Sequence, residues 1–253
     1  MNLKSLQINL NRAELAQTEL LANLDRDGDA FVFIQEPYTY KNKMVRLPKG
    51  YNCFPTRLCG RPRVAIYTKK SSKFAELNAL SSRDCVAAFG KINGMPTVIA
   101  SVYMDINDNN VISPEVSKLI EFVDAGNYAL IIAADTNAHS LLYSDRENKR
   151  GETLDEFILA NHLQIENIGR KPTFQSANGN SIIDVTLTKN LNRAVQHWRV
   201  DQDYNGSDHN TIRFALRREK IVVEPYRPWD RSDWAGFTDQ LRRADIYLSL
   251  IHI

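Results

Sequence analysis

The segment Tyr128-Ala-Leu-Ile-Ile-Ala-Ala-Asp-Thr-Asn137 is the most apolar run of the chain and ends in polar residues. A continuous apolar run of this length is typical of a strand that is buried on both faces. Asp135 closes this predicted strand, and Asn137 follows two positions later, so their side chains can face the same way. Asp-Thr-Asn is also a common turn sequence, so the motif is weak by itself.

Four other short polar motifs stand in a fixed order along the chain, each at or beside an apolar run that is predicted to be a strand. They are Gln7-Ile-Asn9, Gln35-Glu-Pro37, Ile183-Asp184 and Ser207-Asp-His209. Pro37 cannot donate to a sheet, so its strand should stop near Glu36 and leave that side chain at the rim. Strand ends that each deliver a carboxylate, an amide or an imidazole indicate one convergent site for a metal ion and a phosphate.

Apolar periodicity predicts helices that alternate with groups of strands, and no internal repeat is visible. The predicted strands cover residues 3–8, 31–34, 64–68, 86–92, 97–103, 128–134, 163–166, 181–187, 195–200 and 211–216. The predicted helices cover residues 11–24 with Asn11 as N-cap, residues 113–125 with Pro114 in the first position, and residues 152–161. Residues 38–62 are expected to form a long loop region. The next three predicted strands, 64–68, 86–92 and 97–103, are expected to form an antiparallel run. This pattern favours a sandwich of sheets with helices outside.

Composition places the chain among ordinary globular proteins, because 43% of its 253 residues are hydrophobic and 25% are charged. The N-terminus has no apolar signal core, and no apolar run approaches the roughly 20 residues of a membrane helix. We therefore expect no secretory signal and no membrane partner. Cys53, Cys59 and Cys85 are odd in number and lack a zinc-ligand spacing, which favours reduced thiols in an intracellular protein.

Glu36 is the best candidate for a metal ligand. A lone carboxylate at the end of a buried strand is costly unless it has a partner, and a hard cation such as Mg²⁺ prefers oxygen ligands and keeps several waters. Phosphodiester hydrolysis needs such a cation on the phosphate oxygens, together with a positioned water. Asn9 can orient Glu36 or a metal-bound water. The alternative is a rim carboxylate that pairs with a nearby Lys or Arg.

The remaining candidates would act on water and phosphate. Asp135 can orient or deprotonate a water, and the Asn137 amide can donate to a phosphate oxygen. Asp184 is the expected partner of His209, and would hold the imidazole cationic or in the right tautomer. A satisfied core histidine is the alternative reading of His209. Tyr103 ends a predicted strand and could place its hydroxyl on a phosphate, although an ordinary strand aromatic is nearly as good an interpretation.

A resemblance to a known family rests on six segments. They are Leu6-Gln-Ile-Asn-Leu-Asn-Arg12, Ile34-Gln-Glu-Pro-Tyr38, Ala133-Ala-Asp-Thr-Asn-Ala-His-Ser140, Pro172-Thr-Phe174, Ser181-Ile-Ile-Asp-Val-Thr186 and Ser207-Asp-His209. The chain resembles the endonuclease/exonuclease/phosphatase superfamily, and within it the apurinic-type endonuclease domain of non-long-terminal-repeat (non-LTR) retrotransposons. The resemblance implies a deoxyribonuclease-like four-layer α/β sandwich, with two packed mixed or antiparallel sheets flanked by helices.

The resemblance also implies a role for each position. Glu36 would bind the metal with Asn9 beside it, and Asp208 would help the metal or the Asp184–His209 pair. Either Asp135 or His209 could be the general base, and Asn137 and Tyr103 would contact the phosphate. Asn11 stands where repair-type relatives usually carry an aspartate, which puts a second metal ligand there in doubt.

The DNA-facing surface is predicted from basic residues. Arg12 is typical of the retrotransposon branch, and Arg57, Arg61 and Arg63 lie in one loop. The net charge of +2 is too small to establish a nucleic-acid partner, and a solvated surface would explain the cluster equally well. The loops within residues 38–63 and the turn at residues 178–180 are the expected contacts.

The predicted function is a Mg²⁺-dependent (or Mn²⁺-dependent) endonuclease that nicks double-stranded target DNA in the nucleus. The 3′-hydroxyl would prime reverse transcription, with element RNA and a reverse transcriptase domain as partners. A decayed, non-cutting DNA-binding module is one alternative. A second alternative is a host abasic-site repair enzyme, but Pro37 and Tyr38 after Glu36 argue against it. A third is a lipid phosphatase, and the absence of arginine-bearing head-group motifs argues against that.

Three segments are expected along the chain. Residues 1–218 would form the catalytic domain, and residues 219–247, with Trp229, Trp234 and Phe237, resemble the linker toward a reverse transcriptase. Residues 248–253, Leu-Ser-Leu-Ile-His-Ile, read as the translation of a transposase adapter end used in sequencing libraries. An ordinary apolar tail is the alternative for these six residues.

Overall fold

The structure is a computed structural model that describes residues 2–56, 60–191 and 194–217. The chain divides into two units, Met1–Arg218 and Glu219–Ile253, and every described residue falls in the first unit. The predicted linker and tail, as well as Arg57, lie outside the described residues. In the described part, no helix is long and apolar enough to cross a membrane.

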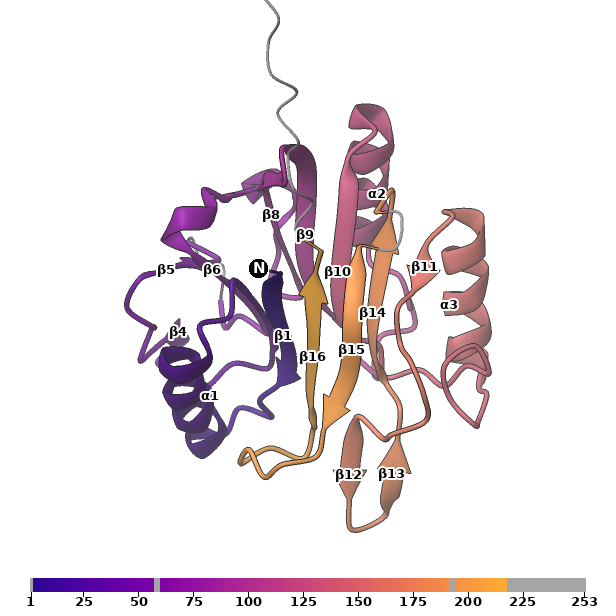
Figure 1. Ribbon diagram of the computed structural model, residues 1–253. Coiled ribbons are helices and arrows are strands. Elements are labelled where there is room, and N and C mark those ends of the chain that lie inside the picture. The colour runs from indigo at the N-terminus through magenta and orange to yellow at the C-terminus, as the bar shows by residue number, and fades with distance from the viewer. Residues whose placement is uncertain (1, 57–59, 192–193, 218–253) are drawn as a thin grey trace, which may run out of the picture. The chain divides into compact units, whose positions relative to one another are not determined.

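Two six-stranded mixed sheets form the centre of the domain (Figure 1). The first sheet has the order β15 (Val195–Asp201), β16 (Thr211–Leu216), β1 (Leu3–Asn9), β2 (Phe31–Gln35), β6 (Val64–Lys69) and β5 (Tyr51–Phe54). The second has the order β11 (Gln164–Ile165), β14 (Asp184–Lys189), β10 (Ala129–Asp135), β9 (Met95–Tyr103), β8 (Cys85–Ile92) and β7 (Ala75–Glu76). The pairs β1–β2 and β9–β10 are parallel, and the others are antiparallel.

Helices cover the outer faces of the two sheets, with α1 (Glu14–Asp27) on one side and α2 (Pro114–Gly126) and α3 (Lys149–Ala160) on the other (Figure 1). One apolar cluster, with Phe33 and Ile131, fills the space between the sheets. Separate clusters lie under α1 and under α2 and α3. These four layers confirm the predicted α/β sandwich. Outside the two sheets lie two short hairpins, β3 (Thr39–Tyr40) with β4 (Lys43–Met44) and β12 (Phe174–Ser176) with β13 (Gly179–Ser181), and two 3₁₀ turns, η1 (Lys70–Ser72) and η2 (Asn78–Leu80).

Strand register brings the polar motifs to one edge of the sandwich. Asp135 pairs in register with Tyr103 on one side and with Asp184 on the other. In the first sheet Asn9 is opposite Gln35, the residue before Glu36. The carboxyl ends of parallel strands meet at the same sheet edge, which is why motifs far apart in the sequence converge.

Three details of the strands differ from the sequence prediction. Strand β6 pairs with β2 and β5 in the first sheet, whereas the antiparallel run contains only β7, β8 and β9. Strand β5 lies in the segment that was predicted to be loop. The predicted strand 181–187 divides into the end of β13 and the start of β14.

The N-terminal ends of two helices also differ from the prediction. Helix α1 begins at Glu14 with Ala13 at the N-cap, while Asn11 adopts a left-handed φ of 45°. Its backbone N–H donates to Asn9 Oδ1 at 2.7 Å, so Asn11 belongs to the turn before the helix. Helix α3 begins at Lys149, where the Asn148 side chain accepts from the N–H of Gly151.

Candidate active site

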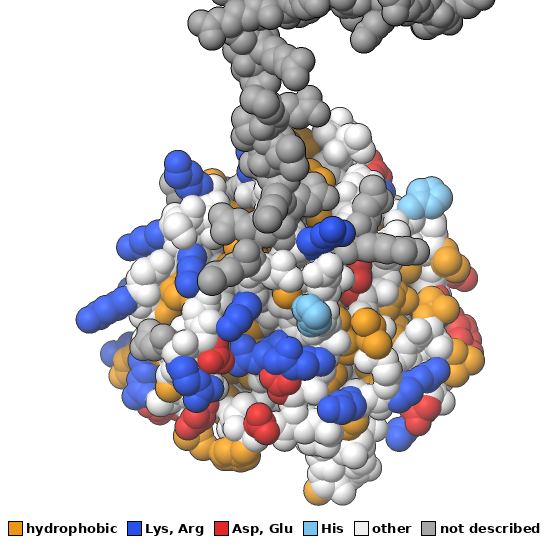
Figure 2. Space-filling model, in the orientation of Figure 1, with side chains coloured by type: hydrophobic (Ala, Val, Ile, Leu, Met, Phe, Trp, Pro, Cys, Tyr) orange, Lys and Arg blue, Asp and Glu red, His pale blue; other side chains and the backbone are white. Residues whose placement is uncertain are grey.

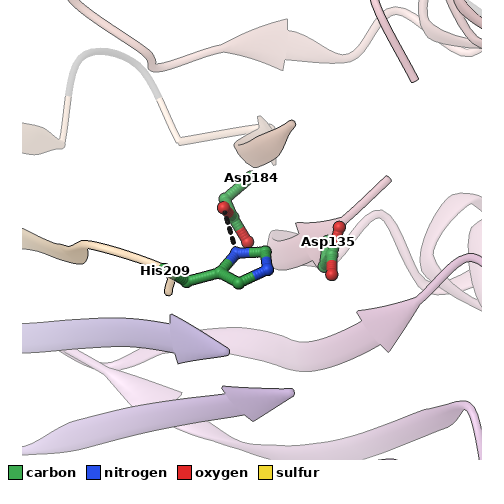
Figure 3. A group of neighbouring side chains, drawn as sticks. All are labelled: Asp135, Asp184 and His209. Carbon is green, nitrogen blue, oxygen red and sulfur yellow. Dashed lines mark hydrogen bonds and ion pairs between the residues drawn. The ribbon is translucent and has the colours of Figure 1, made fainter. Parts of the chain in front are cut away.

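Three buried side chains form the centre of the candidate site (Figure 3). Asp135 ends β10, Asp184 begins β14, and His209 lies in the connection between β15 and β16. Each offers one potential ligand atom, and these atoms all lie within 4.8 Å of one another. Figure 3 shows the imidazole between the two carboxylates. The predicted convergence of these three residues is therefore observed.

The imidazole of His209 is held on two sides. Its Nδ1 atom lies 2.8 Å from Asp184 Oδ2, and its ring packs edge-on against Phe174 with centroids 5.0 Å apart. Burial alone would lower the pKa of His209, but the charge and hydrogen bond of Asp184, together with Asp135 and Asp208, raise it to about 9. The imidazole is therefore cationic at neutral pH, as the sequence prediction allowed.

The carboxylate of Asp135 is completely enclosed. Its Oδ2 accepts from Asn9 Nδ2 at 2.8 Å, and its Oδ1 accepts from the backbone N–H of Asn137 at 3.2 Å. Burial, with the nearby charge of Asp184, raises the pKa of Asp135 to about 7, against the opposing effect of His209. A carboxyl group with this pKa can exchange a proton with water near neutral pH.

Asn9 and Glu36 occupy different environments. The amide of Asn9 donates to Asp135 rather than to Glu36. Glu36 has a left-handed φ of 45° and forms an ion pair with Arg12. This is the rim arrangement that the sequence left open as the alternative. The role of Glu36 as a metal ligand stays a prediction.

Two predicted site residues make contacts at the edge of the triad. Asp208 Oδ2 accepts from Asn11 Nδ2 at 3.0 Å. Asn137 donates from its amide to the carbonyl of Met104 at 3.1 Å, which leaves its second N–H for a ligand. Neither side chain belongs to the group formed by the two aspartates and His209.

Tyr103 is half-buried beside the site. Burial, with Glu36 and Asp135 next, raises its pKa to about 12, so its hydroxyl stays protonated and can donate a hydrogen bond. The guanidinium of Arg63 lies 4.9 Å from the centre of its ring. Arg63 in turn forms ion pairs with Asp84 and Asp105, and these bonds raise its pKa above the usual range despite burial.

The predicted DNA-binding arginines therefore differ in their exposure and in their ion pairs. Arg61 is exposed, Arg12 is occupied by Glu36, and Arg63 is only 12% exposed. Figure 2 shows further Lys and Arg side chains over β1, β16 and α1, mixed with Asp and Glu. Arg213, on β16, pairs with Asp27, Asp29 and Asp201. Basic residues in the sequence therefore overstate the charge that is free for a phosphate backbone.

Three residues hold the site together through contacts that sequence reasoning did not predict. Ser207 Oγ donates to the Asn9 carbonyl at 2.8 Å, and Asn11 links the first motif to Asp208. The Thr173 hydroxyl accepts from the backbone N–H groups of Ile183 and Asp184, each at 3.0 Å. Thr173 and Ser207 lie within segments that carried the resemblance, but their partners depend on tertiary contacts.

The donor set fits a divalent cation. Two buried carboxylates against one imidazolium leave excess negative charge, and Asp184 Oδ1 is a buried oxygen without a hydrogen-bond partner among the described atoms. Oxygen donors suit hard cations. A cation here would offset the repulsion between the carboxylates.

Comparisons with known proteins find similar sequences. Residues 97–213 match the family model described as endonuclease-reverse transcriptase. A 115 kDa protein in the type-1 retrotransposable element R1DM of Drosophila melanogaster is 25% identical over 93% of this chain. The match covers 24% of that relative, so the chain spans about a quarter of its length.

Solved structures extend the likeness to three dimensions. The endonuclease domain of TRAS1, a telomere-specific non-LTR retrotransposon, is 27% identical with a TM-score of 0.71, covering 86% of this chain and 99% of that one. The AP endonuclease LMAP from Leishmania major shares the fold at 14% identity, with a TM-score of 0.69 and coverage of 86% and 88%. The resemblance stated from the sequence is confirmed.

Proposed function

We propose that this chain, which has the endonuclease/exonuclease/phosphatase fold and resembles retrotransposon endonuclease domains, is a divalent-metal-dependent nuclease that nicks double-stranded DNA. The observation that carries the proposal is the convergence of Asp135, Asp184 and His209 on one sheet edge. Asp135, a buried acid with a pKa near neutrality, lies beside the buried imidazolium of His209, and this arrangement suits acid–base chemistry on a phosphodiester.

The charges of the three residues support a role for each of them. His209 is a proton donor and a fixed positive charge beside the phosphate, held by Asp184. Asp135 accepts the proton of the attacking water, because its pKa of about 7 lies below that of His209. Attack by water at phosphorus then breaks the bond to the 3′-oxygen, which leaves as the 3′-hydroxyl after protonation.

The metal would be held by carboxylate oxygens of this same edge. Asp184, with its unpartnered Oδ1, and Glu36 at the rim are the proposed ligands, with Asn9 and Asp208 as supporting residues. Mg²⁺, or Mn²⁺ in its place, would supply charge stabilisation for the phosphate oxygens. Tyr103 and the free N–H of Asn137 would donate to the same phosphate.

The retrotransposon likeness supports the wider proposal. The R1DM and TRAS1 relatives both belong to retrotransposable elements. By analogy, the nick made by this chain would supply a 3′-hydroxyl for reverse transcription of element RNA by a reverse transcriptase domain, in the nucleus. Arg12 and Arg61 are the proposed contacts to the DNA backbone.

Nicking of supercoiled plasmid by the full chain tests the proposal. We expect open-circle DNA with Mg²⁺, none with chelator, and a loss of at least about 100-fold in rate for His209→Asn. His162→Asn is the matched control, because His162 is exposed and Asn tolerates its left-handed φ of 53°. Plasmid that stays supercoiled while the chain binds DNA would instead identify a non-cutting DNA-binding module.

A further inference from the structure

Gln7 is a completely buried amide that joins the two sheets. It stands on β1, and its Nε2 donates to the Ala134 carbonyl on β10 at 3.2 Å. Its Oε1 accepts from the Thr186 hydroxyl on β14 at 2.9 Å. The same hydroxyl accepts from Trp198 Nε1 on β15 at 3.0 Å, so the chain of bonds returns to the first sheet.

Gln35 makes a second buried crossing beside the first. From β2 its Nε2 donates to the Ala133 carbonyl on β10 and to the Ser101 hydroxyl on β9, each at 3.0 Å. Ser101 donates back across the interface to the Ile34 carbonyl at 2.9 Å. We call the four hydrogen-bonding side chains Gln7, Gln35, Ser101 and Thr186 the inter-sheet polar layer.

This layer lies directly behind the candidate active site. Gln7 precedes Asn9 by two residues and Thr186 follows Asp184 by two, so each shares a strand face with its site residue. Gln35 is bonded to Glu36, and Ala134 to Asp135, through the backbone. Much of the other contact between the sheets is an apolar cluster, and apolar contacts are non-directional.

We propose that the inter-sheet polar layer positions the site, and that Gln7 and Thr186 set the sheet register in which Asn9 meets Asp135. The effect on rate rests on the proposed nuclease function. Asn9 and Asp135 come from different sheets and are joined by a single hydrogen bond of 2.8 Å. Because hydrogen bonds restrict both distance and angle, the bonds of the inter-sheet polar layer can fix how these two residues lie relative to each other. A displacement of about 1 Å at such a site can cost on the order of 100-fold in rate.

Thr186 offers a substitution with a rescue and a matched control. Thr186→Val removes the hydroxyl at nearly constant shape, and Thr186→Ser retains it. Thr188→Val makes the same change on the same strand, at a residue that is equally buried but bonds Glu166 rather than the opposite sheet. We expect Thr186→Val to lower kcat by about 10- to 100-fold with KM for DNA nearly unchanged. Thr186→Ser and Thr188→Val should remain near the unmodified rate.

Gln7 and Gln17 form a second matched pair. Both are completely buried glutamines, but Gln17 donates to the Tyr67 hydroxyl under α1, at 3.3 Å. Gln7→Met and Gln17→Met should lower the melting temperature similarly, while only Gln7→Met lowers kcat. Equal kcat losses in the two variants, or an unchanged kcat in Thr186→Val, would show that the layer serves stability alone and would overturn the proposal.

A readout independent of cleavage separates this proposal from the proposed function. The side-chain NH₂ resonances of Asn9 report its bond to Asp135 by NMR. We expect these resonances to move in Thr186→Val and Gln7→Met, but not in Thr188→Val or Gln17→Met. If the unmodified chain fails to nick DNA while this pattern holds, the nuclease proposal fails and positioning stands. Unmoved Asn9 resonances in folded Thr186→Val would refute the positioning.

Discussion

The imidazole of His209 is hydrogen-bonded to Asp184 at 2.8 Å and stands between that carboxylate and Asp135. Two acids and one base therefore share one buried space. Both aspartates raise the pKa of His209, and Asp184 and His209 act in opposite directions on the pKa of Asp135, so the pH dependence of the protein should report their arrangement.

The rate of DNA nicking should follow a bell-shaped pH profile. Activity requires ionised Asp135, with a pKa of about 7, and protonated His209, with a pKa of about 9. The rate should rise as pH increases through the first value and fall through the second, and a bound divalent cation would move the acidic limb lower. Initial rates measured between about pH 5 and pH 10 test this. An alkaline limb that persists unchanged in the residual activity of His209→Asn would rule out its assignment to His209.

Replacing Asp135 with Asn should abolish cleavage and should favour the fold more at neutral pH than at acid pH. The folded-state pKa of about 7 lies above the ordinary value of 3.8, so ionisation of Asp135 destabilises the folded state. This destabilisation is absent below about pH 4 and complete above about pH 7. The free energy of unfolding of Asp135→Asn, relative to the unmodified chain, should therefore increase across this window, by more than about 1 kcal/mol. Denaturant titrations at several pH values measure it.

The control for this change is Asp145→Asn, since the Asp145 side chain is 78% exposed. It should show no comparable dependence on pH. The raised pKa of His209 makes stability fall with pH in the same direction but in a higher window, because its contribution is fully present below about pH 6.5 and lost as pH rises through about 9. A stability difference between Asp135→Asn and the unmodified chain that shrinks from pH 4 to pH 7 would contradict the assigned sign.

Arg63 should matter for stability more than for DNA affinity. Its guanidinium is held by Asp84 and Asp105 under the Tyr103 ring. Arg63→Ala would leave two carboxylates without their cation, at a cost of about 2 kcal/mol in the free energy of unfolding. The exposed Arg61→Ala should change it by less than about 0.5 kcal/mol. Thermal and denaturant unfolding compare the two, and equal effects would contradict the structural role of Arg63.

Local patterns in the sequence predicted the strands and the residues at their ends. The apolar runs before Asp135 and Glu36 are continuous and short, and such runs are typical of strands that are buried on both faces of a sheet. The Asp184–His209 pair was also predicted, because a buried imidazole needs a partner. Strand β5 was missed because Tyr51-Asn-Cys-Phe54 is half-buried at a sheet edge and carries little apolar signal.

Contacts between the sheets could not be predicted from the sequence. Asn9 was expected beside Glu36, its neighbour at the end of the next strand, but it reaches across to Asp135. Arg63 was expected to face DNA because of its charge, and instead pairs with acids 21 and 42 positions away. Both outcomes depend on how the two sheets pack, and no local periodicity encodes that packing.

The ion pair between Arg12 and Glu36 allows two proposed roles to be tested separately: metal binding by Glu36 and DNA contact by Arg12. If Glu36 is a metal ligand, Arg12→Ala frees its carboxylate and removes a competing positive charge. The Mg²⁺ concentration for half-maximal nicking should then fall several-fold, and it should rise in Glu36→Gln. If Arg12 also contacts the DNA backbone, KM for DNA should increase in Arg12→Ala with a weaker dependence on salt.

Arg46→Ala is the control for loss of a surface ion pair, because Arg46 pairs with the exposed Glu14. It should leave both the Mg²⁺ requirement and KM unchanged. Metal titrations of nicking at fixed DNA, and DNA titrations at saturating metal, measure the two effects separately. A Mg²⁺ requirement that is the same in Arg12→Ala, Glu36→Gln and the unmodified chain would remove Glu36 from the ligand set. The metal would then have to be held by Asp135 and Asp184, whose carboxylates are the other buried oxygens at this edge.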